Sequence, residues 1–536
     1  MSALKQTSWP DYFLNYFYMI IDFNDDSAPL GLEADICIIG SGAASLAILT
    51  KLYNSSYKVV VLEAGGEQIT DQNQELYKVI TPFSSFEGAN NGRFRVFGGS
   101  TTRWGGQSLP LDRIDFTRRD WLPNTGWPIC YDSLHKYYAN ADRFLNLDPT
   151  GYEKDIFALL KEKRLNTMDE LQFRFSKWSP LPNLREQYRK EIGKSAHVTL
   201  VKNANVTDLM LTPDHSGVES VVFKNFSKKT GTIKAKRYVL ACGGIENARL
   251  LLVSDTQLPN GIGNGNGLVG RFLQDHPRAE VGSLVSGKKQ QSYLNYFYLG
   301  KTRIMPRFFF SDDFQKKHSM LNSSAFVEFY TQENDVFTIA KEIYRKQIRG
   351  QLTWKEFQLA LKLVKNLPEL LLIAKHYYIN RKVYTPNARA RLNVMTESQA
   401  LWENNVSLSS DVDALGMRRA VINWTIDEKV RHTFLTATEL ISQYFTTTGL
   451  GKIQVDDWLY TDDWKAYIRD SKHHIGTTRM ALSPKEGVVD ENCRVFGTRN
   501  LYMAGSSVFP TSGQSNPTTT LIALAFRLGD HFLETK

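Results

Sequence analysis

Three segments far apart in the chain share one pattern, in which an apolar run ends in a glycine-containing turn. Residues 34–67, 236–252 and 497–510 each predict a buried strand whose carboxyl end meets such a turn. In an open α/β sheet, ligands bind at the carboxyl ends of the strands. The pattern therefore predicts one nucleotide-binding domain that is assembled from three parts of the chain.

The first segment predicts a strand, a turn, a helix and a second strand in that order. Gly40 and Gly42 allow the tight turn, a helical pattern covers residues 43–52, and the second strand, 59–62, ends at Glu63. Glu63 lies 21 residues after Gly42, close to the spacing at which an acidic side chain meets a ribose hydroxyl in a dinucleotide-binding unit. An ordinary crossover without a ligand is the alternative, and it would leave Glu63 as an exposed strand end.

The stretches between these segments predict additional strands and a second domain. Residues 197–211 and 217–225 alternate between apolar and polar positions in the manner of antiparallel strands. Residues 116–195 and 281–465 are expected to form a substrate-facing domain, in which residues 404–426 predict two strands joined by a turn.

Residues 338–382 predict a basic, amphipathic helical segment that Gly350 and Pro368 divide. A helix that packs one face on a core and exposes the other is the simplest interpretation. Contact with a membrane surface, a lipid-linked sugar or an electron-accepting partner is the alternative. The apolar positions that recur at helical spacing are Phe357, Leu361, Val364, Leu367 and Leu371.

Composition adds little to this picture. The chain has 536 residues, of which 42% are hydrophobic and 23% charged, as expected for a folded protein of at least two domains. Its net charge of +9 is mild for this length, and no nucleic-acid-binding motif accompanies it. The four cysteines are far apart and lack metal-ligand spacing, so neither a metal site nor a disulfide framework is expected.

The start of the chain bears on location. The first thirty residues lack the pattern of a signal peptide, and no apolar run reaches the roughly 18 to 20 residues of a membrane span. We therefore expect a cytoplasmic location, with membrane association as the alternative if the basic segment 338–382 contacts a bilayer.

Several short motifs occur together in a fixed order. They are GSGAAS with LEAGGE near the start, FGGSTTRWGGQS at 97–108, LVGRFLQDHP at 268–277, and the block from HHIGTTRM at 473–480 through SGQSNPTTT. From about residue 31 to the end, the chain resembles the glucose-methanol-choline (GMC) flavoprotein oxidoreductases. It is most similar to their bacterial sugar-oxidising and pyranose-oxidase-like branch, because NPTTT stands where other branches carry a histidine. The resemblance implies FAD, not NAD, as the cofactor.

The resemblance also implies a fold and domain boundaries. The fold class is α/β, with a discontinuous Rossmann-like FAD-binding domain, mainly a parallel sheet with helices and an added antiparallel sheet, beside an α+β substrate-binding domain. The FAD-binding domain is expected from residues 31–115, 196–280 and 466–536, the substrate-binding domain from 116–195 and 281–465, and an N-terminal extension from 1–30.

Two residues are expected to carry the chemistry. By resemblance, the first histidine of HxxGT, here His473, is the base that accepts the proton of the substrate alcohol. Asn516 matches the second catalytic position and would donate a hydrogen bond to the alcohol oxygen. Neighbouring side chains of an extended segment point to opposite faces, so His474 is expected to pack elsewhere. A shift of one residue, which would make His474 the base, is the alternative.

The glycine turns and the resemblance together predict contacts with the flavin. Pyranose-oxidase-like relatives carry, before the tryptophan of the 97–108 loop, a histidine that links covalently to the flavin, and Arg103 stands there in this sequence. The FAD is therefore expected to be noncovalent. The predicted flavin-binding residues are Gly40, Ser41, Gly42, Ala43, Ala44, Glu63, Ala64, Gly98, Gly99, Ser100, Arg103, Trp104, Gly105, Val206, Ala241, Cys242, Gly243, Gly505, Ser506, Asn516, Pro517 and Thr518.

These features predict an FAD-dependent oxidoreductase that oxidises an alcohol group of a sugar or polyol. The electrons would pass to oxygen, a quinone or another carrier. Two alternatives stay open from the sequence. The first alternative is the flavin subunit of a membrane-associated dehydrogenase complex. The second is a family member that uses FAD without net alcohol oxidation.

Overall fold

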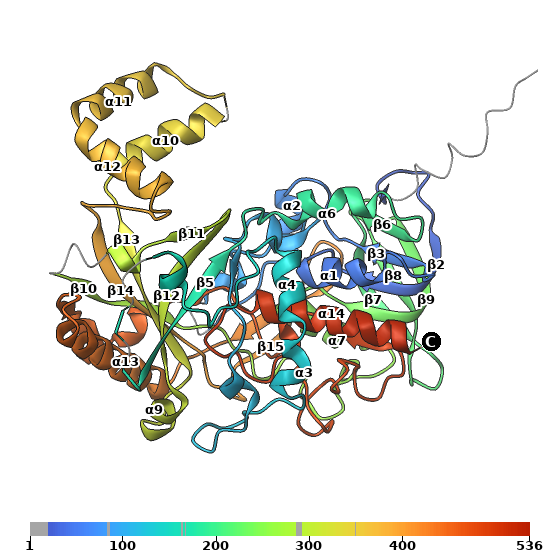
Figure 1. Ribbon diagram of the computed structural model, residues 1–536. Helices are drawn as coiled ribbons and strands as arrows, with labels where there is room; N and C mark the ends of the chain where they lie inside the picture. Colours follow the sequence, from blue (N-terminus) through green and yellow to red (C-terminus); the bar gives the residue numbers. More distant parts are fainter. Residues whose placement is uncertain are drawn as a thin grey trace, which may run out of the picture.

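Two eight-stranded sheets, one at each end of the molecule, form the framework of the fold (Figure 1). The structure is a computed structural model that describes residues 20–82, 86–161, 165–166, 168–285, 292–348 and 350–535. Most of the extension predicted at residues 1–30, namely 1–19, lies outside the described residues. The mixed α/β fold class predicted from the sequence is confirmed.

The first sheet lies at the right of Figure 1 and combines parallel and antiparallel strands. Strands β1, β6, β3, β2, β9 and β18 pair with one another in parallel. Strand β9 also pairs antiparallel with β8, and β8 with β7, so the other edge is an antiparallel meander. The bounds are β1 Ile20–Asp22, β2 Gly31–Ile39, β3 Val59–Leu62, β6 Val198–Lys202, β7 Asn205–Leu211, β8 Val218–Lys224, β9 Thr230–Leu240 and β18 Leu501–Met503.

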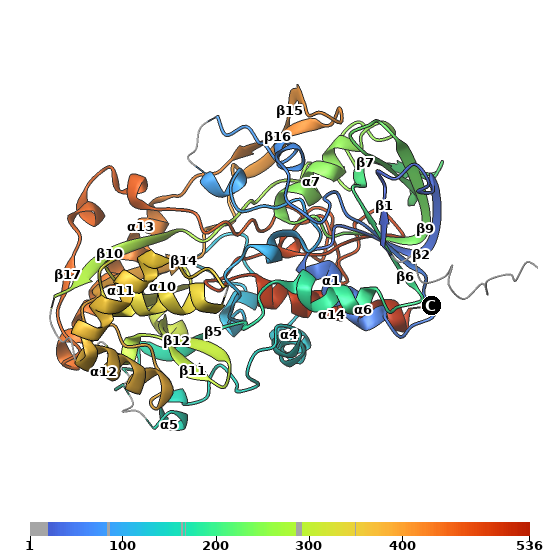
Figure 2. The same cartoon turned by 90° about the horizontal axis from the view of Figure 1, so that it is seen from above.

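The three predicted strand–turn segments meet in this sheet. β2, β9 and β18 lie side by side in parallel, so their carboxyl ends reach one edge although they come from distant parts of the chain. Helix α1 (Ala43–Leu52) follows β2 with the predicted bounds, and α7 (Gly244–Val253) follows β9. α1 packs against the C-terminal helix α14 (Thr518–Glu534), as both views show (Figure 2).

The strand predicted at 197–211 differs from the expectation. It forms two strands, and β6 pairs in parallel with β3, with Val198 opposite Val59. Only β7 has the predicted antiparallel partner. Alternation reports which side chains face the core and says nothing about the direction of the neighbouring strand, which explains the error. In addition, β1 comes from the predicted N-terminal extension and pairs with β6 as an edge strand of this sheet.

The second sheet lies at the left of Figure 1 and is antiparallel throughout its described pairs. Its strand order is β17-β10-β14-β13-β12-β5-β4, with β11 paired to β12. Helix α13 (Glu428–Thr447) covers one face through a second apolar core. The bounds are β4 Gln107–Ser108, β5 Leu171–Trp178, β10 Arg278–Leu284, β11 Phe297–Leu299, β12 Thr302–Phe310, β13 Ser323–Tyr330, β14 Arg389–Thr396 and β17 Ile453–Val455.

The hairpin predicted at 404–426 is present as β15 (Asn405–Val412) and β16 (Arg418–Asn423). Both strands pack against α7, and Val406, Ala420 and Ile422 belong to the core around the first sheet. The hairpin therefore packs with the first sheet, although its sequence lies within the stretch expected to form the substrate-facing domain.

The basic segment forms three helices that project from the second sheet between β13 and β14, at the upper left of Figure 1. They are α10 (Val336–Ile348), α11 (Trp354–Lys365) and α12 (Leu367–Tyr378). The predicted breaks are confirmed, because Gly350 has φ of +64° and Pro368 stands in the first turn of α12. No helix in the described stretches combines the length and apolarity needed to cross a bilayer.

Shorter helices connect these elements. They are α2 (Asp71–Glu75), α3 (Tyr131–His135), α4 (Tyr138–Phe144), α5 (Ile156–Leu159), α6 (Leu184–Ile192) and α9 (Asp312–Lys317).

Candidate active site

The three glycine turns open into one large cavity of about 1090 Å³. Its wall is made by the carboxyl ends of β2, β9 and β18, by the loop before β4, and by the start of α14. Trp178 at the end of β5 adds a side chain from the second sheet. The cavity therefore lies mainly at the carboxyl edge of the first sheet and reaches the second sheet at Gln107 and Trp178.

At the nucleotide end, Glu63 organises the first glycine turn. Its carboxylate accepts hydrogen bonds from the Ser41 N–H at 3.0 Å, the Ser41 hydroxyl at 2.5 Å and the Gly65 N–H at 2.8 Å. Burial raises the pKa of Glu63, and these three donors oppose the rise. Glu63 is thus a buried part of the cavity wall, so the alternative of an exposed strand end is wrong.

Two glycines permit the close approach of backbones here. Gly40 has φ of +98°, and a Cβ on it would lie 2.6 Å from the Ala241 carbonyl oxygen of the neighbouring turn. A Cβ on Gly99 would lie 3.3 Å from the Gly42 Cα. The loop before β4 and the turns that follow β2 and β9 therefore lie close together, with exposed backbone and the N-terminus of α1 between them. Such an arrangement suits a pyrophosphate.

Nearly all predicted flavin-binding residues line this cavity. Gly98 does not, and its N–H instead donates to the Ser41 hydroxyl at 3.0 Å, which fixes the loop behind the wall. Val206 on β7 also lines this cavity. The predicted residues that line it are Gly40, Ser41, Gly42, Ala43, Ala44, Glu63, Ala64, Gly99, Ser100, Arg103, Trp104, Gly105, Val206, Ala241, Cys242, Gly243, Gly505, Ser506, Asn516, Pro517 and Thr518, together with His473.

The two predicted catalytic side chains lie against each other. His473 Nε2 is 3.3 Å from Asn516 Nδ2, although 43 residues separate them in the sequence. His474 also lines the cavity but lies away from Asn516, with its ring edge-on to Phe86 at 5.5 Å between centroids. Its carbonyl oxygen accepts a hydrogen bond from the Ser506 hydroxyl at 2.7 Å. The geometry separates the adjacent histidines as expected for an extended segment.

His276 stands behind His473 and sets its tautomer. His276 Nδ1 lies 2.8 Å from His473 Nδ1, and His276 Nε2 lies 3.3 Å from the Ser512 carbonyl oxygen. A carbonyl only accepts, so the proton of neutral His276 is on Nε2 and its Nδ1 accepts from His473. His473 then carries its proton on Nδ1, which leaves a lone pair on the Nε2 that faces Asn516.

Burial keeps both rings neutral. Burial lowers the pKa of His276 to about 4. The pKa of His473 lies well below its ordinary value because of burial first and repulsion from His276 and His474 next, with smaller contributions from the positive charges of Arg307 and Arg278. His473 is therefore a neutral imidazole at physiological pH, the form that can accept a proton.

Asp275 holds the two histidine segments together. Its carboxylate accepts from the N–H groups of His276 at 2.6 Å, Ser471 at 2.9 Å and His473 at 2.9 Å. Asp275, His276 and His473 bring potential metal-ligand atoms within 4.8 Å of one another. Because the Asp275 oxygens already accept from three backbone N–H groups and the two histidine Nδ1 atoms already contact each other, we assign the trio to positioning. Asp275 and His276 belong to the LQDHP motif, but the motif lies almost two hundred residues before His473, so the sequence did not predict the contacts between them.

Arg307 lies on the face of the second sheet that turns toward the cavity. Trp178, which lines the cavity, packs with Met305, Phe326 and Met395 on that face. The buried Arg307 guanidinium lies 4.3 Å above the Phe326 ring. Among the described residues, its Nε and Nη1 have no hydrogen-bond partner, and burial and Arg278 lower its pKa to about 9. Arg307 therefore presents an unpaired charge beside the histidines.

Two further arginines of the cavity wall were not predicted. Arg93 and Arg95 bind Glu246 at 3.0 and 2.9 Å. Burial opposes ionisation of Glu246, but these arginines and Arg249 outweigh it and hold its pKa at about 2. No local sequence pattern identifies this network, because its members come from segments about 150 residues apart.

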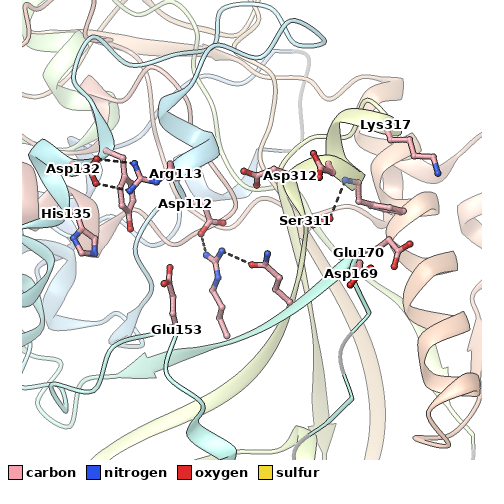
Figure 3. A pocket seen from close by; sticks show the side chains of 15 residues that line it. Asp112, Arg113, Asp132, His135, Glu153, Asp169, Glu170, Ser311, Asp312 and Lys317 are labelled. Atoms are coloured by element: carbon pink, nitrogen blue, oxygen red, sulfur yellow. Dashed lines mark hydrogen bonds and ion pairs between the residues drawn. The ribbon is translucent and has the colours of Figure 1, made fainter.

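A second cleft, of about 1000 Å³, lies between α3 and α9 (Figure 3). Seven of its fifteen lining residues are carboxylates, against three lysines and arginines, and the Arg113 side chain that Figure 3 shows among them pairs with Asp132 at 2.8 Å. This negative lining would repel a pyrophosphate. The acidic residues are Asp112, Asp132, Glu153, Asp169, Glu170, Asp312 and Asp313.

The comparisons with known proteins agree with this geometry. The family model described as GMC oxidoreductase matches residues 401–525. The chain is 24% identical to 2-methyl-1,2-propanediol dehydrogenase of Mycolicibacterium austroafricanum over 93% of this chain and 95% of the relative. It is 22% identical to the fructose dehydrogenase large subunit of Gluconobacter japonicus over 94% of this chain and 98% of the relative.

A solved structure shares the fold. The crystal structure of a formate oxidase superposes with a TM-score of 0.55 and 15% identity, covering 94% of this chain and 98% of that one. The resemblance read from the short motifs is therefore supported: the C-terminal part of the chain matches the GMC oxidoreductase model, and nearly the whole chain is similar to the two dehydrogenases.

Proposed function

We propose that this protein is a flavin-dependent oxidoreductase that converts an alcohol group of a sugar or sugar-derived substrate into a carbonyl. The observation that carries the proposal is the pairing of His473 Nε2 with Asn516 Nδ2 at 3.3 Å on the wall of the glycine-lined cavity. Relatives named for a diol and for fructose support a CH–OH substrate.

The cofactor in this proposal is noncovalent FAD. The cavity fits it in size and lining, because bare glycine backbone, the N-terminus of α1 and the Glu63 carboxylate meet at one end. Arg103 has no atom that forms a covalent link to a flavin. The bound flavin would supply the ring that accepts a hydride, and the residues of the glycine turns would hold and orient it.

The chain's own groups would handle the proton. His473 accepts the hydroxyl proton on Nε2 while its Nδ1–H donates to His276, which stabilises the imidazolium that forms. Asn516 donates from Nδ2 to the alcohol oxygen as negative charge develops there. Asp275 fixes the backbone of both histidines, so the ring does not have to reorganise.

Buried polar atoms without partners, on strands of the second sheet and in the segment that carries Asn516, favour a polyhydroxylated substrate over an apolar alcohol. Several such atoms have no hydrogen-bond partner among the described residues, and a buried unpaired donor or acceptor costs about 1–3 kcal/mol. Hydroxyls of a sugar would satisfy them. The atoms are Ser176 Oγ, Ser324 Oγ, Arg303 Nε, Arg307 Nε, Arg307 Nη1, Ser512 Oγ, Gln514 Oε1 and Asn516 Oδ1.

The electron acceptor in this proposal is oxygen, a quinone or another carrier. A second candidate function is that of the flavin subunit in a membrane-associated dehydrogenase complex. The apolar surface of α10–α12 favours this candidate, and one relative is named as a large subunit.

Anaerobic mixing with a panel of sugars and polyols tests the proposal. We expect purified protein to be yellow and its flavin absorbance to bleach with at least one member of the panel. His473→Ala should keep the flavin and reduce it about 10²- to 10⁴-fold more slowly, the range that a general base supplies. His432→Ala, on the exposed side of α13, is the matched control. Colourless protein would refute the cofactor, and yellow protein that no alcohol bleaches would indicate a flavin without alcohol oxidation.

A further inference from the structure

The helices α10, α11 and α12, here called the helical protrusion, carry an unusual apolar surface. Of the 23 large apolar side chains exposed among the described residues, twelve lie on the protrusion and its connecting turns. Trp354 is 70% exposed and Val364 68%. Scattered exposed apolar residues are normal on a protein surface, but a contiguous patch marks an interaction site.

The protrusion reverses the core packing expected from the sequence. Phe357, Leu361 and Val364 face outward on α11, whereas Glu356 on the same helix is buried. The Glu356 carboxylate binds Lys346 of α10 at 2.5 Å and the Thr353 N–H at 2.9 Å. The inner face of α11 therefore combines these polar contacts with the half-buried Leu359 and Leu363, and the apolar stripe on the opposite face stays available. The expectation that these apolar positions pack on a core is wrong.

The stripe on α11 is continuous and has a cationic border. At about 100° per residue, Trp354, Phe357, Leu361 and Val364 fall within an arc of about 80°. The exposed lysines of α11 occupy the adjoining arc. Leu367, Leu371 and Tyr378 extend the apolar surface onto α12. The bordering lysines are Lys355, Lys362 and Lys365, with Lys375 on α12.

Positive charge is concentrated in the same segment. Residues 336–382 contain ten lysines and arginines against three glutamates, a net charge of +7 in a chain whose total is +9. The rest of the protein is therefore nearly neutral. A partner that fits this surface must accept apolar and aromatic side chains and supply negative charge around them.

An anionic lipid bilayer meets both requirements. Helices that lie in the membrane interface combine an apolar stripe with lysine and arginine beside it, and tryptophan and tyrosine are enriched at that depth. Five aromatic rings of the protrusion are exposed in this way: Tyr344, Trp354, Phe357, Tyr377 and Tyr378. Lysine stems reach past the acyl boundary to lipid phosphates.

We propose that the helical protrusion docks the protein on an anionic lipid surface, with α11 and α12 lying in the interface. The protrusion follows β13 and leads into β14, and these two strands also carry Phe326 and Met395, which pack with the cavity-lining Trp178. The docking does not depend on the flavin chemistry, so an experiment that refutes the docking leaves the proposed alcohol oxidation untouched, and the reverse also holds.

Vesicle co-sedimentation of the full-length, flavin-loaded protein tests the docking. We expect binding to vesicles that contain about a third phosphatidylglycerol, little binding to pure phosphatidylcholine, and loss of most binding in 0.5 M salt. The triple variant Trp354→Ser, Phe357→Ser, Leu361→Ser should lower the bound fraction at least tenfold. The matched control Leu181→Ser, Tyr460→Ser, Leu482→Ser removes equally exposed side chains elsewhere and should bind as the unaltered protein does.

A second measurement locates the contact. Brominated acyl chains should quench part of the tryptophan fluorescence in the unaltered protein, and Trp354→Phe should abolish that part while it keeps vesicle binding. Full binding by the triple variant would overturn the proposal. The proposal would also be overturned if the unaltered protein did not bind vesicles but self-associated, and the triple variant did not self-associate. The surface would then be an interface between copies of this chain.

Discussion

The contact between His276 and His473 gives a prediction that distinguishes a positioned base from an isolated one. In His276→Leu, the acceptor for His473 Nδ1 is lost while the apolar volume is roughly kept. A hydrogen bond from a charged donor is worth about 1.5–3 kcal/mol and one from a neutral donor about 0.5–1.5 kcal/mol. His473 is neutral before proton transfer and charged after it, so the difference, about 1–2 kcal/mol, is lost from the transition state.

That difference corresponds to a fall of about 5- to 30-fold in the rate of flavin reduction. The assay is anaerobic stopped-flow reduction at saturating substrate, with flavin content checked by absorbance. His276→Asn keeps an acceptor near the position of Nδ1 and should recover part of the rate. If His276→Leu reduced its flavin at the original rate with full flavin content, the tautomer assignment would be wrong.

Two other changes probe the surroundings of the site. Arg307→Met removes a positive charge that lowers the pKa of His473, so the acid limb of kcat/KM against pH should move to higher pH; an unmoved limb would show that the charge is screened. Gly244→Ala would place a Cβ 2.2 Å from the His474 carbonyl oxygen, and we expect a loss of about 1–3 kcal/mol of stability with reduced flavin content. Gly265→Ala, where a Cβ meets nothing within 4 Å, is its control in thermal unfolding, and equal melting temperatures would contradict the steric reasoning.

Local sequence signals were sufficient for the nucleotide-binding turns. The glycines at 40 and 42 and the apolar run before them predicted the strand, turn and helix with the bounds of α1. These features depend on backbone freedom and periodicity within a few residues, which the sequence states directly.

Features that depend on partners distant in the chain were missed or misread. The parallel pairing of β6 and the contact of His276 with His473 both arise from the final packing, over a separation of 197 residues in the second case. The stripe on α11 has the same period whether it meets a core or a lipid, so periodicity alone predicted the wrong environment for Phe357 and Leu361.

The parallel pairing of β18 with β9 has a consequence for synthesis of the protein. β18 and α14 complete the sheet edge and the cavity wall, yet the ribosome makes them more than two hundred residues after β9. A nascent chain that already holds its first glycine turn still lacks Gly505 and Asn516. The cofactor pocket therefore closes late in translation, and a chain stalled before residue 501 would expose the apolar edge of β9 to chaperones.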